Sequence, residues 1–414
     1  MKSGVLLISF VSLLLFCFLT PFGHQKIEWQ GSIEQEDGVT VIKNPEEPLF
    51  GKIELELEED LVIGHEEDEN FRFYKWISLD VDADGNIHVM DRGSFRIQIF
   101  DRNGAYIRTI GREGEGPGEF SQPTFLRLDD AGNTYVEDRT KAHIFDKDGT
   151  YVRAFPKPMS SRSFKITQKG ELLGEDRTIR PPKDLYECVV LMNDQNKVLK
   201  KMAEFYSPKM DSMFNRKDRF AIHVPELCFC PAVQDYAVYG FPEEYRLFVA
   251  DSDGNITKII EKDEPAEKIT NRERDKIIDV LMGNIKSRPS STQLAREELE
   301  KRVLISKFRP FFEELRIDEH GNIYAQRLNS YLSEDKRYEF DVFNAEGRHT
   351  YRLRVPAGVI NLRIIKGGYV FSAPYNQEIG YFQVKRYKIK NWDPQSMRSQ
   401  SMRSDHFNYL QTNN

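Results

Sequence analysis

The chain has 414 residues, and its 59 Lys and Arg against 66 Asp and Glu leave a formal net charge of −7. No basic block stands out, so the charge pattern argues against nucleic acid as a partner. The length would allow two or three ordinary domains, but the repeated pattern described below takes up most of the chain as one domain.

Residues 1 to 23 have the pattern of an export signal. A basic start precedes the apolar run Val5 to Leu19, which is too short for a comfortable membrane span. We expect cleavage after Gly23 and a periplasmic or extracellular protein. Because Pro21 and Phe22 make a poor cleavage site, an uncleaved N-terminal membrane anchor stays as the alternative.

Two copies of one β-rich pattern follow, joined by a glycine-rich linker, Gly111 to Phe120. In each copy an Asp-x-x-Gly-Asn or similar turn separates two short runs of β-forming residues. The turn glycines Gly85 and Gly132 lie 47 residues apart, within the ~40 to 50 residue period of propeller blades, each of which is a four-stranded antiparallel sheet. These copies therefore predict the first two blades of a β-propeller.

Four weaker copies complete the ring. They span Lys165 to Met202, Arg219 to Ile260, Glu314 to Val355 and Ile360 to Lys388. The fourth blade is expected to begin with a strand over Arg219 to His223. The last copy lacks a fourth strand, and Ile53 to Leu57 alternate like a half-buried strand that would supply it. We therefore predict an all-β, six-bladed β-propeller over residues 24 to 390, closed by an N-terminal strand, which removes exposed sheet edges. A polar tail follows over residues 391 to 414.

A helical insertion over residues 266 to 306 interrupts the linker between blades four and five. Thr270 and Glu273 form a capping box, and apolar residues follow at helical spacing. A second helix is expected from Thr292 to about Ser306. Because interblade linkers open at the channel mouth, we expect the helices to lie over this mouth as a lid, with packing on the propeller rim as the alternative.

These motifs carry a family resemblance. The Gly-Pro-Gly-Glu-Phe linker, and the recurring Asp-x-x-Gly-Asn-x-x-Val-x-Asp followed by Arg-Ile-x-Ile-Phe-Asp, resemble NHL-repeat six-bladed β-propellers and, more narrowly, the exported bacterial six-bladed propeller group. The resemblance is strongest over residues 73 to 155. It implies the fold and leaves the chemistry open, because propellers host binding modules, lyases and lactonases alike.

An acceptor followed by Arg recurs near the end of the second strand of four blades. The members are Asp91 and Arg92, Asp138 and Arg139, Asp176 and Arg177, and Gln326 and Arg327. We expect these side chains to ring the channel mouth together with Arg112 and Glu119 of the glycine-rich linker. Alternating charges there would bind a carboxylate, phosphate or sugar through bidentate Arg contacts. The alternative is structural, with the Asp capping a turn and the Arg pairing with it.

A weak calcium candidate lies at the first turn. Asp80, Asp82 and Asp84, with Asp91 at the twelfth position, match an EF-hand loop except for the final Glu. Both flanks are β-rich and the turn recurs in other blades without the full set of acids. A hairpin turn is therefore the favoured interpretation, and a calcium site is the alternative.

Three cysteines remain after signal removal: Cys188, Cys228 and Cys230. An odd count prevents complete pairing, and the Cys-x-Cys spacing in a strand places two sulfurs on one face. We expect buried thiols or one disulfide to Cys188 rather than a zinc site, because the usual second ligand pair is missing.

Catalysis has little support in the sequence, which contains no Gly-x-Ser-x-Gly elbow, no His-Glu-x-x-His and no phosphate-binding loop. We therefore expect an exported binding module that is not an enzyme. It would bind a small anionic or sugar ligand, or a protein or peptide, through the channel-mouth face. The alternative is a metal-dependent lyase or hydrolase, lactonase-like or amidating-lyase-like, with its site in the central channel.

Overall fold

The computed structural model describes residues 28–129, 131–156, 164–166, 171–180, 184–193, 195, 197–207, 220–231, 237–251, 253–286, 295–334, 337–359 and 361–392. The predicted export signal lies outside these residues, as does the predicted tail from residue 393 onward. In the described part of the chain, no helix is long and apolar enough to cross a membrane.

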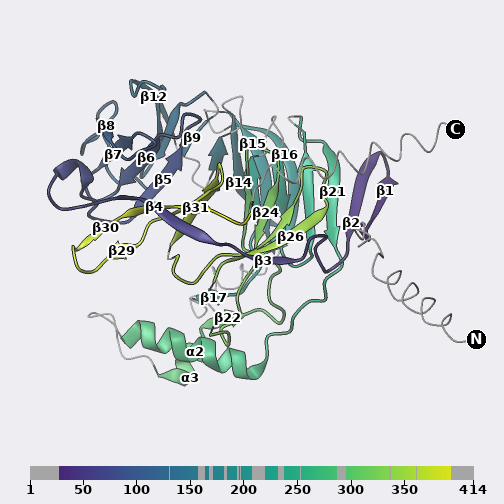
Figure 1. The fold of residues 1–414 in the computed structure, drawn as a ribbon. Helices are drawn as coiled ribbons and strands as arrows, with labels where there is room; N and C mark the ends of the chain where they lie inside the picture. The colour runs from purple at the N-terminus through teal and green to yellow at the C-terminus, as the bar shows by residue number, and fades with distance from the viewer. Residues whose placement is uncertain are drawn as a thin grey trace, which may run out of the picture.

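Six antiparallel sheets, each with four strands at its core, make up the fold (Figure 1). From the innermost strand outward, the first sheet contains β5 (Ile77–Val81), β6 (Ile87–Asp91), β7 (Arg96–Phe100) and β8 (Tyr106–Ile110). The second contains β9 (Phe125–Leu128), β10 (Thr134–Glu137), β11 (Lys141–Phe145) and β12 (Tyr151–Pro156). The third contains β13 (Phe164–Ile166), β14 (Leu172–Arg180), β15 (Asp184–Met192) and β16 (Val198–Ser207). The fourth sheet contains β18 (Cys228–Pro231), β19 (Ala237–Gly240), β20 (Arg246–Ala250) and β21 (Ile256–Lys262). The fifth contains β23 (Glu314–Ile317), β24 (Ile323–Gln326), β25 (Glu339–Phe343) and β26 (His349–Arg354). The sixth contains β27 (Leu362–Lys366), β28 (Tyr369–Ser372), β31 (Val384–Ile389) and β4 (Leu57–Ile63).

The hydrophobic core is divided among the interfaces between neighbouring sheets. Each buried cluster combines side chains of two adjacent sheets, and the cluster with Ile77 and Val384 joins the first sheet to the last. Because successive side chains of a strand point to opposite faces, Leu172 packs against the second sheet and Leu173 against the fourth. The innermost strand β27 also contacts β5. The sheets are therefore the blades of a closed six-bladed propeller, as the repeats predict.

The N-terminal segment closes the ring, but at a different place from the one predicted. Blade six is completed by β4, which pairs antiparallel with β31. The predicted closing strand, Ile53 to Leu57, begins instead in β3 (Lys52–Glu54), which pairs parallel with β26 of blade five. Short alternating segments resemble one another, so only the tertiary structure decides which one reaches the open edge.

A hairpin that the sequence analysis missed precedes these strands. It consists of β1 (Ser32–Glu36) and β2 (Val39–Asn44), and β2 pairs parallel with β21. The N-terminal segment therefore runs along the outer edges of blades four, five and six in turn (Figure 1). It covers edges that would otherwise present unpaired backbone groups.

The predicted first strand of blade four is wrong. Residues Phe220–Ile222 form β17, which pairs parallel with β22 (Val303–Ile305) from the helical insertion. The innermost strand of the blade is β18, whose Cys228 and Cys230 enter the core between blades four and five. Burial of these side chains, rather than β propensity alone, selects the strand that faces the axis.

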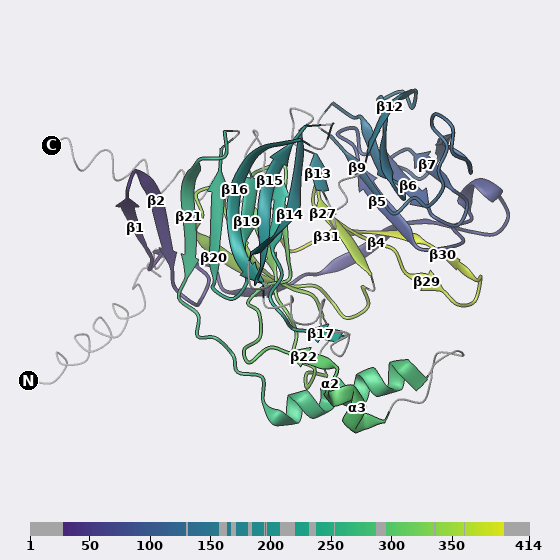
Figure 2. The ribbon, with the colours of Figure 1, turned by 180° about the vertical axis from the view of Figure 1, so that it is seen from behind.

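The insertion between blades four and five contains α2 (Asn271–Lys286) and α3 (Arg296–Glu300), which lie beyond one face of the ring (Figure 1, Figure 2). Thr270 caps α2 as predicted, because its Oγ1 accepts a hydrogen bond from the Glu273 backbone N–H at 3.2 Å. The second predicted helix, Thr292 to Ser306, is wrong in extent. In the described residues it covers only α3, and Val303–Ile305 is a strand.

Glu273 fixes the insertion to blade five. Its buried carboxylate accepts hydrogen bonds from Ser330 Oγ at 2.7 Å, from the Tyr331 backbone N–H at 2.9 Å and from Arg309 at 3.0 Å. Ser330 and Tyr331 belong to the loop that follows the second strand of blade five. The insertion is therefore held on the face where the second strands end, which is the face expected for the channel mouth. Whether it acts as a lid stays a prediction.

Candidate functional site

The predicted acceptors Asp91 and Asp138 are fully buried and cap backbone turns. Asp91 accepts hydrogen bonds from the backbone N–H groups of Tyr74 at 3.1 Å and Gly93 at 2.8 Å. Asp138 accepts one from the backbone N–H of Ser121 at 2.8 Å. Burial alone would raise the pKa of Asp138, but its hydrogen bonds lower it well below the usual range. These two carboxylates therefore have the structural role given as the alternative above, in which the Asp caps a turn.

The neighbouring residues Arg92 and Arg139 are exposed on the surface. In the glycine-rich linker, Arg112 Nε donates to Glu119 Oε1 at 2.8 Å, and Glu119 Oε2 accepts the Gly116 backbone N–H at 2.9 Å. The linker is thus closed on itself by its own two charged side chains.

The third predicted pair does not lie at a strand end. Asp176 and Arg177 are inside β14, which continues to Arg180 and pairs with β15 along its whole length. Arg177 Nε donates to Glu175 Oε1 of the same strand at 2.8 Å. Asp176 lies as far along β14 as Asp91 does along β6, but the longer hairpin of blade three continues beyond this level to Arg180.

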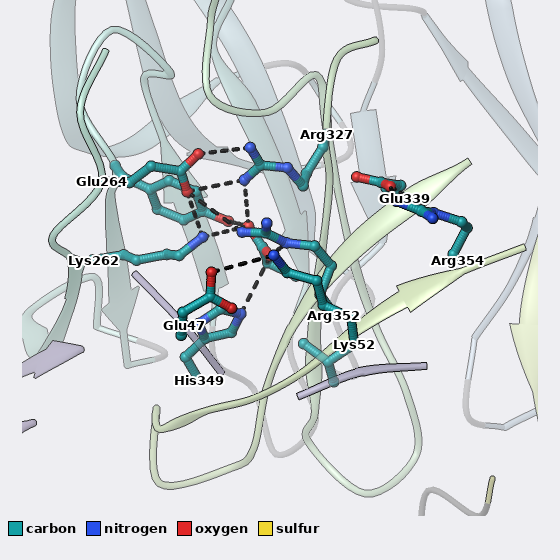
Figure 3. A network of polar contacts seen from close by, with 12 residues as sticks. Glu47, Lys52, Lys262, Glu264, Arg327, Glu339, His349, Arg352 and Arg354 are labelled. Atoms are coloured by element: carbon teal, nitrogen blue, oxygen red, sulfur yellow. Dashed lines mark hydrogen bonds and ion pairs between the residues drawn. The ribbon is translucent and has the colours of Figure 1, made fainter. Parts of the chain in front are cut away.

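Arg327 lies in a buried polar cluster between blades four and five, centred on Asp341 (Figure 3). Five side chains surround the Asp341 carboxylate: Tyr245 Oη at 2.7 Å, Lys262 Nζ at 2.8 Å, Arg327 Nη1 at 2.8 Å, Arg352 Nε at 2.7 Å and His349 Nε2 at 3.2 Å. Glu264 is a second acceptor in this cluster, because its Oε1 accepts a hydrogen bond from Arg327 Nη2 at 2.6 Å. We call these seven residues the Asp341 cluster.

The charges of the Asp341 cluster nearly cancel. Burial would raise the pKa of Asp341, but its contact with His349 and the charges of Lys262 and Arg327 hold the pKa well below the usual range. Burial lowers the pKa of His349, so this imidazole is neutral at pH 7. Two carboxylates therefore face three cations. Because the cations have partners and are nearly inaccessible to solvent, the cluster joins the two blades rather than presenting a ligand site.

The calcium candidate is a hydrogen-bonded turn. Asp82 Oδ1 accepts the backbone N–H groups of Asp84 at 2.9 Å and Asn86 at 2.8 Å, and Asp82 Oδ2 accepts Asn86 Nδ2 at 2.8 Å. Asp80 Oδ2 accepts the Leu128 backbone N–H of the next blade at 3.0 Å. Within the described ranges, no group of three or more His, Cys, Asp or Glu is placed to hold a metal ion.

The side chains of Cys188, Cys228 and Cys230 are buried. Cys228 and Cys230 lie in the same cluster, as their spacing predicts, whereas Cys188 lies in the cluster between blades two and three. No disulfide joins the two positions because they belong to different interfaces.

Three arginines of the innermost strands form a set that the sequence analysis missed. They are Arg127 in β9, Arg316 in β23 and Arg363 in β27. Arg127 and Arg316 occupy equivalent register positions, because each pairs with a Tyr of the second strand, and Arg363 lies at a bulge beside β28. Each follows a Leu that packs into an interblade core, so the Arg takes the opposite side of its strand.

The charges of Arg127 and Arg316 both act on Arg363, although blades two and five lie opposite each other. Burial lowers the pKa of Arg363, and the positive charges of Arg316 and Arg127 lower it further, against the opposing effects of Tyr338 and Glu314. Innermost strands surround the central channel of a propeller. Side chains from blades two, five and six can act on one charge only near this axis, so the set lies at the channel.

Arg363 has no counterion in the part of the chain that the structure describes. Among the described residues its guanidinium has no hydrogen bond and no ion pair, and Nε is buried without a partner. Its Cζ lies 5.2 Å from the ring centre of Trp76, which is in T-shaped contact with Phe125 at 5.3 Å. Arg127 Cζ lies 5.8 Å from the ring centre of Phe125. These four residues form a row across blades six, one and two, at the ends of the innermost strands where the interblade linkers enter.

The signal for this set was present in the sequence. Leu-Arg-Leu occurs at 126–128, and Leu-Arg-Ile occurs at 315–317 and at 362–364, each in the first strand of a blade. A charged residue between two apolar residues of a buried strand is unusual, and its recurrence in three blades marks one shared environment.

Comparison with known proteins agrees with the fold. Residues 73–243 match the DUF5128 family model, described as a 6-bladed beta-propeller. No curated protein matches the chain in sequence. The structure of a protein from Bacteroides fragilis NCTC 9343, named as an exported protein, is similar with a TM-score of 0.50 and 11% identity, and the match covers 85% of this chain and 100% of that one.

Two further solved structures are similar at lower TM-scores. A member of the duf4221 family from Bacteroides vulgatus has a TM-score of 0.44 at 14% identity, over 82% of this chain and 99% of that one. Virginiamycin B lyase from Staphylococcus aureus has a TM-score of 0.39 at 9% identity, over 81% of this chain and 100% of that one. The family match and the blade interfaces together establish a six-bladed propeller. Identities this low leave its chemistry open.

Proposed function

We propose that this six-bladed β-propeller is an exported binding module that takes a small anionic ligand at the mouth of its central channel. The observation that carries the proposal is Arg363, a half-buried guanidinium without a counterion among the described residues. A buried cation without a partner is costly, and a bound anion would offset that cost. Arg127 and Arg316 add positive charge at the same place.

The surroundings of Arg363 suit a small ligand. The half-buried rings of Trp76 and Phe125 lie beside the arginines and offer apolar contact area. Guanidinium groups bind carboxylates and phosphates through paired hydrogen bonds. The predicted signal over residues 1 to 23 supports export, which cell fractionation of the native protein would test.

Binding can be measured with defined probes. Isothermal titration of the purified protein with 3-phenylpropanoate, inorganic phosphate, galacturonate and neutral glucose should detect binding of at least one anion and none of glucose. Arg363→Gln should weaken binding of that anion at least tenfold, because a charge-assisted hydrogen bond contributes about 1.5–3 kcal/mol. The matched control is Arg139→Gln, which changes an exposed arginine on the same face.

The proposal is overturned if no anion in the panel binds, or if Arg139→Gln weakens binding as much as Arg363→Gln does. Elemental analysis of the same protein distinguishes the metal-dependent lyase or hydrolase. Stoichiometric metal whose removal abolishes binding would favour that enzyme over a binding module.

A further inference from the structure

The channel mouth also carries a negative group in blade five, next to the blade that contains Arg363. Glu313 lies directly before β23 of blade five, and its carboxylate accepts a hydrogen bond from the side-chain amide of Gln326. Gln326 ends the second strand of the same blade, and its Oε1 accepts from Arg316 Nη2 at 3.3 Å. Glu313 is thereby placed next to the arginine set.

Glu313 is exposed to solvent, yet burial raises its pKa. Because Glu313 directly precedes the innermost strand β23, its exposed side chain lies near the mouth of the channel. Glu314 adds to the raised pKa and Arg316 opposes it. No cation forms an ion pair with the Glu313 carboxylate in the described part of the chain.

Glu313 and Arg363 are thus two charges of opposite sign without direct counterions, at one channel mouth. They lie at the starts of the innermost strands of two neighbouring blades, with Glu313 directly before β23 of blade five and Arg363 second in β27 of blade six. The ion pair between Arg316 Nη2 and Glu314 Oε2, at 2.9 Å, belongs to the same strand start of blade five. A ligand that reaches over this pair would satisfy both groups with one molecule.

We propose that the ligand is a small zwitterion, an amino acid or a short peptide, whose carboxylate binds Arg363 and whose ammonium group binds Glu313. The inference rests on the proposed function, because it names the ligand class of that same site. Trp76 and Phe125 supply the apolar part of the recognition, so an amino acid with an aromatic side chain fits better than glycine.

This assignment can be tested by titration calorimetry with phenylalanine and with three probes that each lack its ammonium group, its carboxylate or its aromatic ring. These three are 3-phenylpropanoate, phenethylamine and glycine. Phenylalanine should bind at least tenfold more tightly than 3-phenylpropanoate, which lacks the ammonium group, and more tightly than the other two. The dipeptide Phe-Phe, whose charges are farther apart, shows whether the site takes a free amino acid or a peptide.

Two variants separate this inference from the proposed function. Glu313→Gln should weaken phenylalanine binding tenfold or more and leave 3-phenylpropanoate binding unchanged, whereas Arg363→Gln should weaken both. If 3-phenylpropanoate binds as tightly as phenylalanine and Glu313→Gln affects neither, the zwitterion is rejected and the anion site stands. If none of the probes binds, both proposals fail.

Discussion

Arg327 and Arg363 are both partly buried, but they differ in what lies beside them. Arg327 contacts two buried carboxylates, Glu264 and Asp341, within 3.0 Å. Within the described ranges, the groups that act on Arg363 are two other arginines, an ion-paired Glu314, a tyrosine and the ring of Trp76. The difference separates two uses of a buried cation: one joins blades, and the other, as we propose, binds a ligand that brings the missing negative charge.

The largest change in stability is expected from a substitution at the centre of the Asp341 cluster. Asp341→Asn should lower the free energy of unfolding by about 3–5 kcal/mol, because it leaves buried cations unpaired. Chemical denaturation at pH 7 measures this loss. The control Glu339→Gln, which removes a more exposed ion pair with Arg354, should cost about 1 kcal/mol or less. A loss below 1 kcal/mol for Asp341→Asn would show that the cluster is not a structural joint.

The two arginines should respond in opposite directions when each is replaced by Met. Arg327→Met should cost about 3 kcal/mol, because Glu264 and Asp341 lose a shared partner. Arg363→Met should leave the free energy of unfolding unchanged or raise it by up to about 1 kcal/mol, because an uncompensated charge is replaced by an apolar side chain. The same denaturation experiment measures both. Equal losses would contradict the distinction between the two sites.

The smallest effect is the expected loss of stability as the pH falls below 7. The folded-state pKa of His349 is lowered by burial, so the unfolded chain binds a proton first as pH falls below about 6.5. Stability should therefore decline from pH 7 to pH 5, by up to about 1.4 kcal/mol per pH unit for this group. His349→Gln should flatten this dependence, while His88, whose pKa is also lowered by burial, still contributes. Identical slopes for both proteins would refute the role of His349.

The candidate site was predicted less well than the fold, for a physical reason. At the ends of second strands, the pattern of an acceptor and an Arg looks the same in each blade, yet Asp91 caps a turn and Arg327 enters a buried cluster. Local sequence indicates that a polar group is present. It does not indicate which distant blade will supply its partner.

By itself, the sequence determined the number of blades, the turns and the capped start of the insertion, because each depends on residues close together in the chain: alternation in strands, Asp-x-x-Gly-Asn turns, and Thr270 before a helix. Only the tertiary structure decided the path of the N-terminal strands, the docking of the insertion through Glu273 and the choice of channel-lining arginines. These features depend on contacts between residues far apart in the sequence. Closing the ring creates those contacts.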